Sequence, residues 1–251
     1  MSDVLTEMHD GVLRLTLSRP GKKNALTRAM YTALTEGLER AAGDDSVRAI
    51  VIAAEGSDFC AGNDILDFAQ GVADYQSPDI DINELPVFRF LRALTFCDKP
   101  LIAAVQGQAV GVGVTLLLHC DLVVAADDAR LSLPFLKLGL VPEAGSTLLL
   151  PRRIGHARAF GWMALGEKMP AEEALRLGLI NRISDAAGLN AAIDQMTAAI
   201  CALSPAAVRH TKQLMRDPAE TWAVVEEEAR IFRRLLSSPE AMAAFTAFLS
   251  R

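Results

Sequence analysis

The residues with the clearest chemical potential lie in two glycine-bearing turns and one acidic turn. Gly111 and Gly113 open the apolar run GQAVGVGVTLLLHC, and Gly62 lies in the upstream turn FCAGND. Glu143 is the single acidic residue of the otherwise uncharged segment LGLVPEAGST. Glycines let backbone N–H groups approach a ligand closely, and a carboxylate that faces the same space can move a proton. The pattern predicts an enolate held by two backbone donors, with proton transfer by Glu143.

Each of these features also has a purely structural interpretation. Glycine turns of this kind mostly serve tight turns and close packing. An acidic residue just before a helix is favoured there by the helix dipole, without any chemistry. The functional interpretation therefore depends on the rest of the chain.

Composition excludes several classes of protein. The 251 residues are 51% apolar and 22% charged, which suffices for one large domain with a helical appendage. The net charge of −6 is not that of a nucleic-acid binder. We expect no signal peptide, because the first residues lack an uninterrupted apolar core, and no membrane partner, because no run reaches ~18 apolar residues. Cys60, Cys97, Cys120 and Cys201 are widely spaced, as expected of free thiols in a reducing, cytoplasmic compartment.

Hydropathy patterns predict a repeating βα core, which would position the turns. Residues 47–53 form a nearly continuous β-branched run, typical of a strand buried on both faces. A helix is expected over 24–42, with Thr27 as its N-cap. Metal-ligand spacing is not found in any cluster, so no metal is expected. Further strands are expected at 4–8, 11–18, 101–105, 122–126, 129–134 and 180–183, and helices at 86–97, 147–154, 157–164 and 170–177.

Two stretches complete this outline. Residues 67–86 have little periodicity and are expected to form a loop or short helices covering a site. Residues 107–114 should form a glycine-spaced turn that leads into a helix ending near Leu118. Strands are concentrated before residue 183, so we expect an α/β core over 1–187 and a helical region over 188–251. The helices of that region are expected at 189–203, 205–215, 218–236 and 239–249.

Four segments together resemble the crotonase (enoyl-CoA hydratase/isomerase) superfamily. They are SRPGKKNALT, VRAIVIAAEGSDFCAGNDI, the stretch from CDKPLIAAVQ to PEAGST, and AEEALRLGLINRI, which are spread over most of the chain. The resemblance implies a β-β-α spiral core with a helical C-terminal trimerisation region. It also implies an acyl-CoA thioester substrate, no separate cofactor because CoA is part of the substrate, and a homotrimer or a dimer of trimers.

The resemblance assigns the oxyanion hole to two backbone N–H groups, those of Asn63 and Val112. An α-proton of a thioester is abstractable only when negative charge on the oxygen is stabilised, and pre-aimed donors do this without reorganisation. The dipole of the helix after the second turn would add to the effect. Asp64 is also expected to brace its turn. The resemblance places CoA and the acyl group along mainly backbone contacts, at Lys23, Ala25, Ala61, Gly62, Asp64, Ile65, Gly111 and Phe135.

Hydratases of this family resemble one another in using two glutamates, at positions that here hold Thr115 and Phe135. Neither residue transfers a proton at neutral pH, so hydration by that mechanism is not expected. Thr115 is expected only to hydrogen-bond within its own helix. Glu143 occupies the position of the catalytic glutamate in monofunctional Δ3,Δ2-enoyl-CoA isomerases, and the chain resembles their peroxisomal type. The resemblance thus implies an isomerase of fatty-acid β-oxidation.

One carboxylate suffices for that reaction, because the C2 proton of a 3-enoyl-CoA is both α to the thioester and allylic. Phe135, Leu140 and Val141 should form an apolar wall that raises the pKa of Glu143 toward working pH. His119 is expected to be a buried core residue. The alternatives are another enolate chemistry, such as isomerisation of an epoxide, an atypical hydratase, or a non-catalytic acyl-CoA-binding protein.

Overall fold

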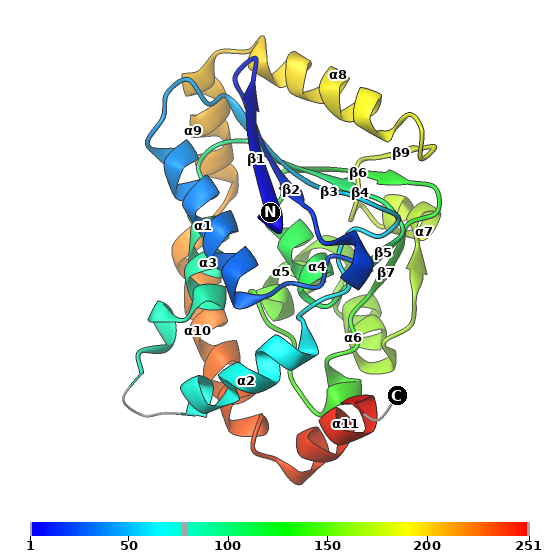
Figure 1. Ribbon diagram of the computed structural model, residues 1–251. Helices are drawn as coiled ribbons and strands as arrows, with labels where there is room; N and C mark the ends of the chain where they lie inside the picture. The colour runs from blue at the N-terminus through cyan, green and yellow to red at the C-terminus, as the bar shows by residue number, and fades with distance from the viewer. Residues whose placement is uncertain (1, 77–79, 250–251) are drawn as a thin grey trace.

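The computed structural model describes residues 2–76 and 80–249, and it shows a mixed α/β core wrapped by helices (Figure 1). Within these ranges the strands form a six-stranded sheet, ordered β1-β2-β3-β4-β6-β9, and a three-stranded sheet, ordered β5-β7-β8. In the larger sheet only the β1–β2 pair is antiparallel. The strands are β1 Val4–His9, β2 Val12–Leu17, β3 Ala49–Ala54, β4 Leu101–Val105, β5 Gln108–Val110, β6 Leu122–Ala126, β7 Arg130–Ser132, β8 Met169–Pro170 and β9 Arg182–Ser184.

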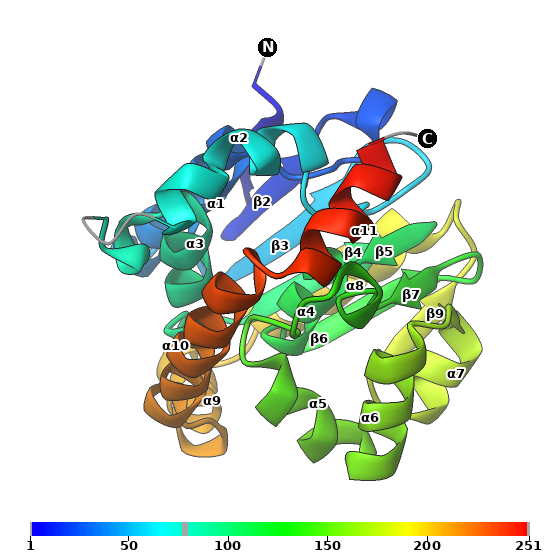
Figure 2. The ribbon, with the colours of Figure 1, turned by 90° about the horizontal axis from the view of Figure 1, so that it is seen from below.

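Helices fill most of the chain between the strands, and from residue 189 to 249 the described elements are all helical. Seen from below, α10 leads into α11 (Figure 2), and α11 contacts the short helix η4. The α-helices are α1 Arg28–Ala42, α2 Ile65–Gln76, α3 Pro86–Thr95, α4 Val112–Thr115, α5 Ser146–Ile154, α6 His156–Leu165, α7 Ala171–Arg176, α8 Leu189–Cys201, α9 Pro205–Met215, α10 Pro218–Leu235 and α11 Pro239–Leu249. The 3-10 helices are η1 Pro20–Lys22, η2 Ile82–Glu84, η3 Leu116–Leu118 and η4 Leu136–Leu138.

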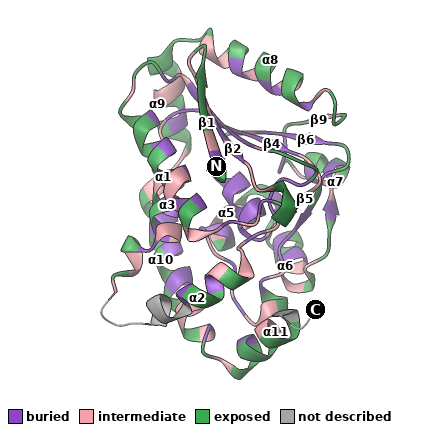
Figure 3. Cartoon of the chain, in the orientation of Figure 1, coloured by how far each residue is buried: buried purple, intermediate pink, exposed green. Residues whose placement is uncertain are grey.

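Strand β3 is buried on both faces, as its β-branched run predicts. Ile50 and Ile52 pack into the main core, whereas Val51 packs in a second cluster with Leu189 and Ile193 of α8. This alternation follows from the two-residue period of a strand. The sheet therefore lies between α8 on one side and the main helical core on the other. Its central strands β3, β4 and β6 are largely buried, whereas the edge strand β1 is mostly exposed (Figure 3).

Helix α1 begins at Arg28, four residues later than predicted, although its N-cap is the predicted one. The Thr27 side chain accepts a hydrogen bond from the N–H of Met30, which satisfies one of the unpaired donors of the first turn. Asn24 instead adopts a positive φ of 54°. Its buried amide donates to the carbonyls of Glu55 and Asp58, each at 2.8 Å. Asn24 thus connects the residues before α1 to the loop after β3.

Other local differences concern the surroundings of the predicted site. Residues 108–110, inside the predicted glycine turn, form β5 and pair with β7. The predicted helix through Leu118 is the four-residue α4 followed by η3. The segment 67–86 contains most of α2 and all of η2, so the expectation of short helices is correct, and residues 77–79 of it lie outside the described residues. The boundary at residue 187 stays a prediction.

Candidate functional site

Three stretches that are far apart in the sequence lie side by side in the fold. Residues 23–26 pair with 61–64, through hydrogen bonds from Leu26 N–H to Gly62 O and from Asp64 N–H to Leu26 O, both 2.8 Å. Residue 60 in turn pairs with 108–110, since Val110 N–H donates to Cys60 O at 2.9 Å. We call these three stretches the backbone seam. The seam contains Lys23, Ala25, Ala61, Gly62 and Asp64, and Gly111 directly follows its third stretch.

The N–H groups of Asn63 and Val112 are available at this seam. Neither donates to an acceptor among the described residues. Each follows a glycine with positive φ, +95° at Gly62 and +56° at Gly111, a conformation that side-chain-bearing residues rarely adopt. The two predicted donors are therefore unpaired and are carried by adjacent turns.

The two turns are held together by direct contact of their backbones. A Cβ atom on Gly113 would lie 2.7 Å from Cys60 O, and one on Gly62 would lie 3.2 Å from Val110 O. Helix α4 has only four residues, so its dipole contributes less than the sequence led us to expect. The Val112 N–H is one of the N–H groups of the helix's first turn, which have no partner within the helix.

Glu143 lies in the turn between η4 and α5, and its carboxyl group faces α4. Thr115 Oγ1 donates to Glu143 Oε1 at 2.5 Å. The residue as a whole is partly exposed, but protein encloses its carboxyl group. This burial raises the pKa of Glu143 to about 7, the Thr115 hydrogen bond opposes the rise, and the charge of Glu228 adds to it. Burial is thus the main reason why the pKa of Glu143 lies well above the ordinary value for glutamate.

Of the three residues expected to form an apolar wall, Phe135 lies beside the second donor turn, whereas Leu140 packs with Phe68, Leu236 and Ala241. Phe135 and Leu140 are buried and Val141 is half-buried. A Cβ on Gly111 would lie 3.7 Å from Cζ of Phe135, so the aromatic ring stands beside the second donor turn. A buried aromatic ring beside this turn limits the access of water there and strengthens electrostatic interactions.

Three further predicted binding residues, Lys23, Asp64 and Ile65, lie in the seam or directly after one of its stretches. Lys23 is exposed, and its Nζ lies 3.6 Å from Asp58 Oδ2. Ile65 begins α2 and is half-buried. Asp64 braces its turn as expected, because it accepts from the N–H groups of Leu66 and Asp67 at 3.0 Å and pairs with Arg19 at 2.7 Å. Burial opposes ionisation of Asp64, but these donors outweigh it and lower its pKa.

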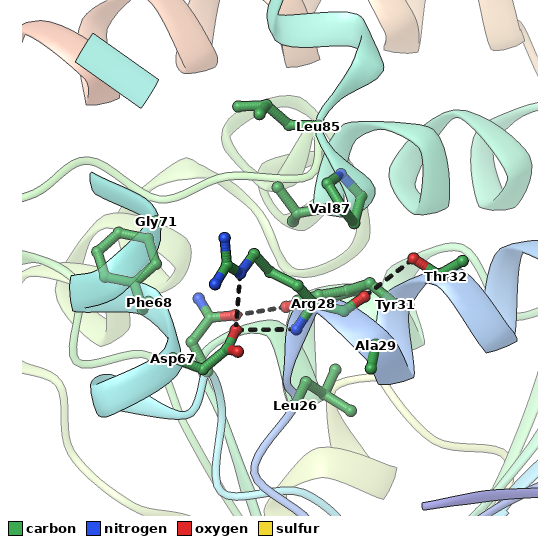
Figure 4. Close-up of a pocket in the computed structure, with 12 residues that line it drawn as sticks. Leu26, Arg28, Ala29, Tyr31, Thr32, Asp67, Phe68, Gly71, Leu85 and Val87 are labelled. Atoms are coloured by element: carbon green, nitrogen blue, oxygen red, sulfur yellow. Dashed lines mark hydrogen bonds and ion pairs between the residues drawn. The ribbon is translucent and has the colours of Figure 1, made fainter. Parts of the chain in front are cut away.

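A cavity of about 450 Å³ opens beside the first donor turn (Figure 4). Asn63 lies on its wall, together with apolar side chains from α1, α2 and the start of α3. Arg28 reaches into it, with Nε 3.5 Å from the Asp67 carboxylate, which also accepts from the backbone N–H of Arg28 at 2.9 Å. Its lining residues are Leu26, Arg28, Ala29, Tyr31, Thr32, Asn63, Asp67, Phe68, Gly71, Leu85, Pro86 and Val87.

Sequence reasoning missed several residues that support the site. Thr115 was expected to bond within its own helix, whereas its hydroxyl binds Glu143. Tyr31 donates its hydroxyl proton to the Asn63 side chain. His119 is a buried core histidine, as predicted, but its Nε2 also lies 2.7 Å from Ala144 O. Helical spacing was a weak indication that Glu228 is buried, because it lies on the buried face of α10 and follows two exposed glutamates in the sequence.

Other predicted features are as follows. The four cysteines are free thiols. Over residues 2–76 and 80–249, side chains of His, Cys, Asp and Glu form no group that could hold a metal ion. Across the same part of the chain, a single helix long and apolar enough to cross a membrane is not found; α8 and α9 satisfy that criterion only as a pair, bent by 103°.

This chain matches a protein-family model, known protein sequences and solved structures. The model of the Enoyl-CoA hydratase/isomerase family matches residues 7–251. The 1,2-epoxyphenylacetyl-CoA isomerase of Escherichia coli (strain K12) is 39% identical over 189 residues, or 74% of this chain and 71% of that protein. Enoyl-CoA delta isomerase 2 of Rattus norvegicus is 31% identical over 250 residues, or 99% of this chain and 63% of that protein. The structure of OdaA from Pseudomonas aeruginosa matches with a TM-score of 0.93 and 43% identity, covering 100% of both chains.

These relatives differ in the reactions that they are named for. The rat delta isomerase is less similar than the epoxide isomerase, and probable enoyl-CoA hydratases also match. The expected closeness to one isomerase type is therefore only weakly supported. One family model fits the chain from residue 7 onward, and a 43% identical structure shares its fold from end to end. This protein belongs to the enoyl-CoA hydratase/isomerase family and is an acyl-CoA enzyme of the crotonase superfamily.

Proposed function

We propose that this protein moves the double bond of a 3-enoyl-CoA to the 2-position. The observation that carries the proposal is the hydrogen bond from Thr115 to the carboxyl group of Glu143. Thr115 lies one helical turn beyond Val112, whose N–H is unpaired among the described residues. Base, acid and oxyanion donors are thereby available for a reaction that needs nothing more. The proposal makes the protein a Δ3,Δ2-enoyl-CoA isomerase.

In this mechanism Glu143 acts twice. Its carboxylate removes a proton from C2, and the electron pair moves into a dienolate whose negative oxygen accepts hydrogen bonds from the N–H groups of Asn63 and Val112. The resulting carboxylic acid then returns the proton to C4, so the double bond lies between C2 and C3. A pKa near 7 favours both steps, because the group neither holds nor releases the proton too strongly.

Hydration by two glutamates has no support in the side chains around Glu143. By the family resemblance, Thr115 and Phe135 occupy the positions at which the hydratases of this family carry glutamates. Thr115 is fully buried with its hydroxyl committed to Glu143, and Phe135 is a buried aromatic side chain. Neither group activates water.

Isomerisation of an epoxide-bearing acyl-CoA is the second candidate function. It is favoured by the 39% identity to 1,2-epoxyphenylacetyl-CoA isomerase of Escherichia coli. The same oxyanion donors would serve an enolate formed from that substrate, with Glu143 as the base. Substrate choice separates the two candidates, whereas loss of Glu143 does not.

The test is an assay of the purified protein with three substrates: a 3-enoyl-CoA, a 2-enoyl-CoA and 1,2-epoxyphenylacetyl-CoA. We expect the 3-enoyl-CoA to be converted to the conjugated thioester, followed by its absorbance, with a loss of roughly 10² to 10⁴-fold in Glu143→Gln. Glu172→Gln, which changes an exposed acid, is the matched control. Equal rates for Glu143→Gln and wild type would refute the role of Glu143. Turnover of the epoxide only would select the second function, and binding without any turnover would indicate a non-catalytic protein.

Three further properties belong to the same proposal. CoA enters as part of the substrate, with no additional cofactor. The protein assembles as a homotrimer or a dimer of trimers, which the exposed apolar side chains Leu203, Leu214 and Met215 support. The four free thiols are compatible with a cytoplasmic location. Light scattering on the purified protein tests the assembly.

A further inference from the structure

The turn that carries Glu143 is held by a residue from the far end of the chain. Glu228 of α10 accepts from the N–H of Gly145 at 2.6 Å, and from the N–H and the hydroxyl of Thr147 at 2.9 and 2.6 Å. The side chain is only 4% exposed. Both carboxyl oxygens are used, and every contact is with a donor. Helix α10 thus supplies the cap for the start of α5, immediately after Glu143.

This turn needs such support because its backbone is unusual. Ala144 and Gly145 both have positive φ, 65° and 70°, and alanine rarely adopts that conformation. A Cβ on Gly145 would lie 3.0 Å from Cγ2 of Thr221, so α10 packs directly against the turn. The left-handed conformation costs free energy at Ala144 but not at Gly145, so contacts from outside help to hold the turn beside Glu143.

A second contact holds the opposite side of the turn. Nε2 of His119, which is fully buried, lies 2.7 Å from the carbonyl oxygen of Ala144. Burial lowers the pKa of His119 to about 3, so the ring is neutral and donates from Nε2. His119 therefore binds the carbonyl and Glu228 binds the next N–H along the chain. The peptide group between Ala144 and Gly145 is therefore held at both its carbonyl oxygen and its N–H.

Glu228 also acts on Glu143 through charge. Burial raises the pKa of Glu228 to about 7, against the effect of its three hydrogen bonds, and its charge contributes to the raised pKa of Glu143. Two other groups contact Glu143 or its turn. Thr115 of α4 is uncharged, and His119, which follows η3, is neutral. The charge of Glu228 is therefore one cause of the raised pKa of Glu143, after burial.

We propose that Glu228 is a positioning residue of the reaction, which fixes the Glu143 turn through Gly145 and Thr147 and sets the charge that Glu143 meets. The C-terminal helical region is then part of the machinery for proton transfer, and not only a surface for assembly. This inference rests on the proposed function for its kinetic readout. The competing explanation is that Glu228 caps α5 and stabilises the fold, without affecting Glu143.

Glu228→Gln separates these explanations, because it keeps the length of the side chain and removes its charge. We expect kcat for the 3-enoyl-CoA to fall roughly 10²-fold, as for a small misplacement of a reacting group, with little change in KM. The acid limb of the pH profile should move to lower pH, because a like charge near Glu143 is lost. Glu226→Gln, an exposed position on the same helix, is the matched control and should leave kcat, KM and the pH profile unchanged.

Glu228→Asp provides the complementary test, since it keeps the charge but is one methylene shorter. We expect a lower kcat with the acid limb near its wild-type position. Lower melting temperatures in both variants, with wild-type kcat and pH profile, would overturn the proposal in favour of simple capping. If Glu228→Gln does not fold, the kcat of Glu228→Asp decides in the same way, and a wild-type value rejects the proposal.

A measurement without turnover keeps this test separate from the reaction itself. In protein labelled with ¹³C at glutamate carboxyl groups, the Glu143 resonance is identified by its absence from Glu143→Gln. Its titration midpoint should lie at lower pH in Glu228→Gln than in wild type, and an unchanged midpoint would reject the electrostatic influence of Glu228. If the wild-type protein does not isomerise 3-enoyl-CoA, the proposed function fails while this titration still judges Glu228.

Discussion

Thr115 Oγ1 donates a 2.5 Å hydrogen bond to Oε1 of Glu143, and this contact joins the short helix that begins at Val112 to the turn that carries Glu143. The N–H of Thr115 itself donates to Gly111 O at 2.9 Å, so the hydroxyl is fixed relative to the second donor turn. In the proposed mechanism Oε2 is the oxygen that exchanges a proton with substrate, because Oε1 accepts from Thr115. The hydroxyl also lowers the pKa of Glu143 against the effect of burial.

Thr115→Val removes this hydroxyl with almost no change of shape. A hydrogen bond to a charged group contributes about 1.5–3 kcal/mol, so its loss should raise the pKa of Glu143 by about 1–2 units. We expect the acid limb of kcat/KM for 3-enoyl-CoA to move up by that amount, with a lower rate at pH 7. Thr197→Val is the control, because this buried threonine bonds within α8. A wild-type pH profile for Thr115→Val would contradict the role given to the hydroxyl.

The wild-type pH profile follows from the same group. Proton abstraction requires ionised Glu143, and burial raises its pKa to about 7. We therefore expect kcat/KM to rise with pH and to level off above about 7, as measured with a 3-enoyl-CoA across pH 5 to 9. An acid limb near 4.5, the ordinary value for glutamate, would mean that the enclosed carboxyl group is not the base.

Much of the core could be predicted from the sequence because its signals are local. The β-branched run 47–53 encodes β3 at Ala49–Ala54, and Thr27 encodes the start of α1. Glycine turns and the acidic turn were recognisable from residue type, and the family resemblance supplied their relationship. Strand β5 was missed because its three residues lie inside the glycine-spaced turn and pair only with distant residues.

The missed parts of the site depend on contacts between distant residues. Thr115 and Glu143 are 28 positions apart, and Gly145 and Glu228 are 83 apart. Hydrophobic periodicity reports which face of a helix is buried, but not which polar group it meets there. Only the fold shows that the buried Glu228 meets a turn with unpaired N–H groups.

Gly113→Ala tests whether the two donor turns must remain in contact. Its Cβ would lie 2.7 Å from Cys60 O and 2.8 Å from Cys60 Cβ, and a backbone oxygen cannot move aside without shifting the seam. We expect a loss of about 1–3 kcal/mol in the free energy of unfolding, as for overpacking, together with most of the activity. The measurements are chemical denaturation and the 3-enoyl-CoA assay.

Gly161→Ala is the matched control for that change. Gly161 lies within α6, and nothing is found within 4 Å of a Cβ placed there. Alanine in a helix interior is favoured over glycine by about 0.5–1 kcal/mol, so this variant should be slightly more stable and fully active. Equal behaviour of the two variants would show that the contact between the turns has no special importance.

Glu143 should also make the protein less stable as pH rises. Its pKa is about 7 in the folded state and near 4.5 when unfolded, so the folded state holds the extra proton between these values. Stability therefore decreases as pH rises from about 4.5 to about 7, and the full cost persists above that range. Glu143→Gln removes this cost, which we estimate at about 1–3 kcal/mol.

The expected result is that Glu143→Gln unfolds at a higher temperature than wild type at pH 8, by about 2–4 °C for each kcal/mol. At pH 4 the two proteins should have nearly equal melting temperatures, because Glu143 is then largely protonated in both states. Glu172→Gln, at an exposed position, should show no such dependence on pH. A lower melting temperature for Glu143→Gln at pH 8 would mean that the ionised carboxylate is stabilised by the fold, and would remove the physical basis for its action as a base near pH 7.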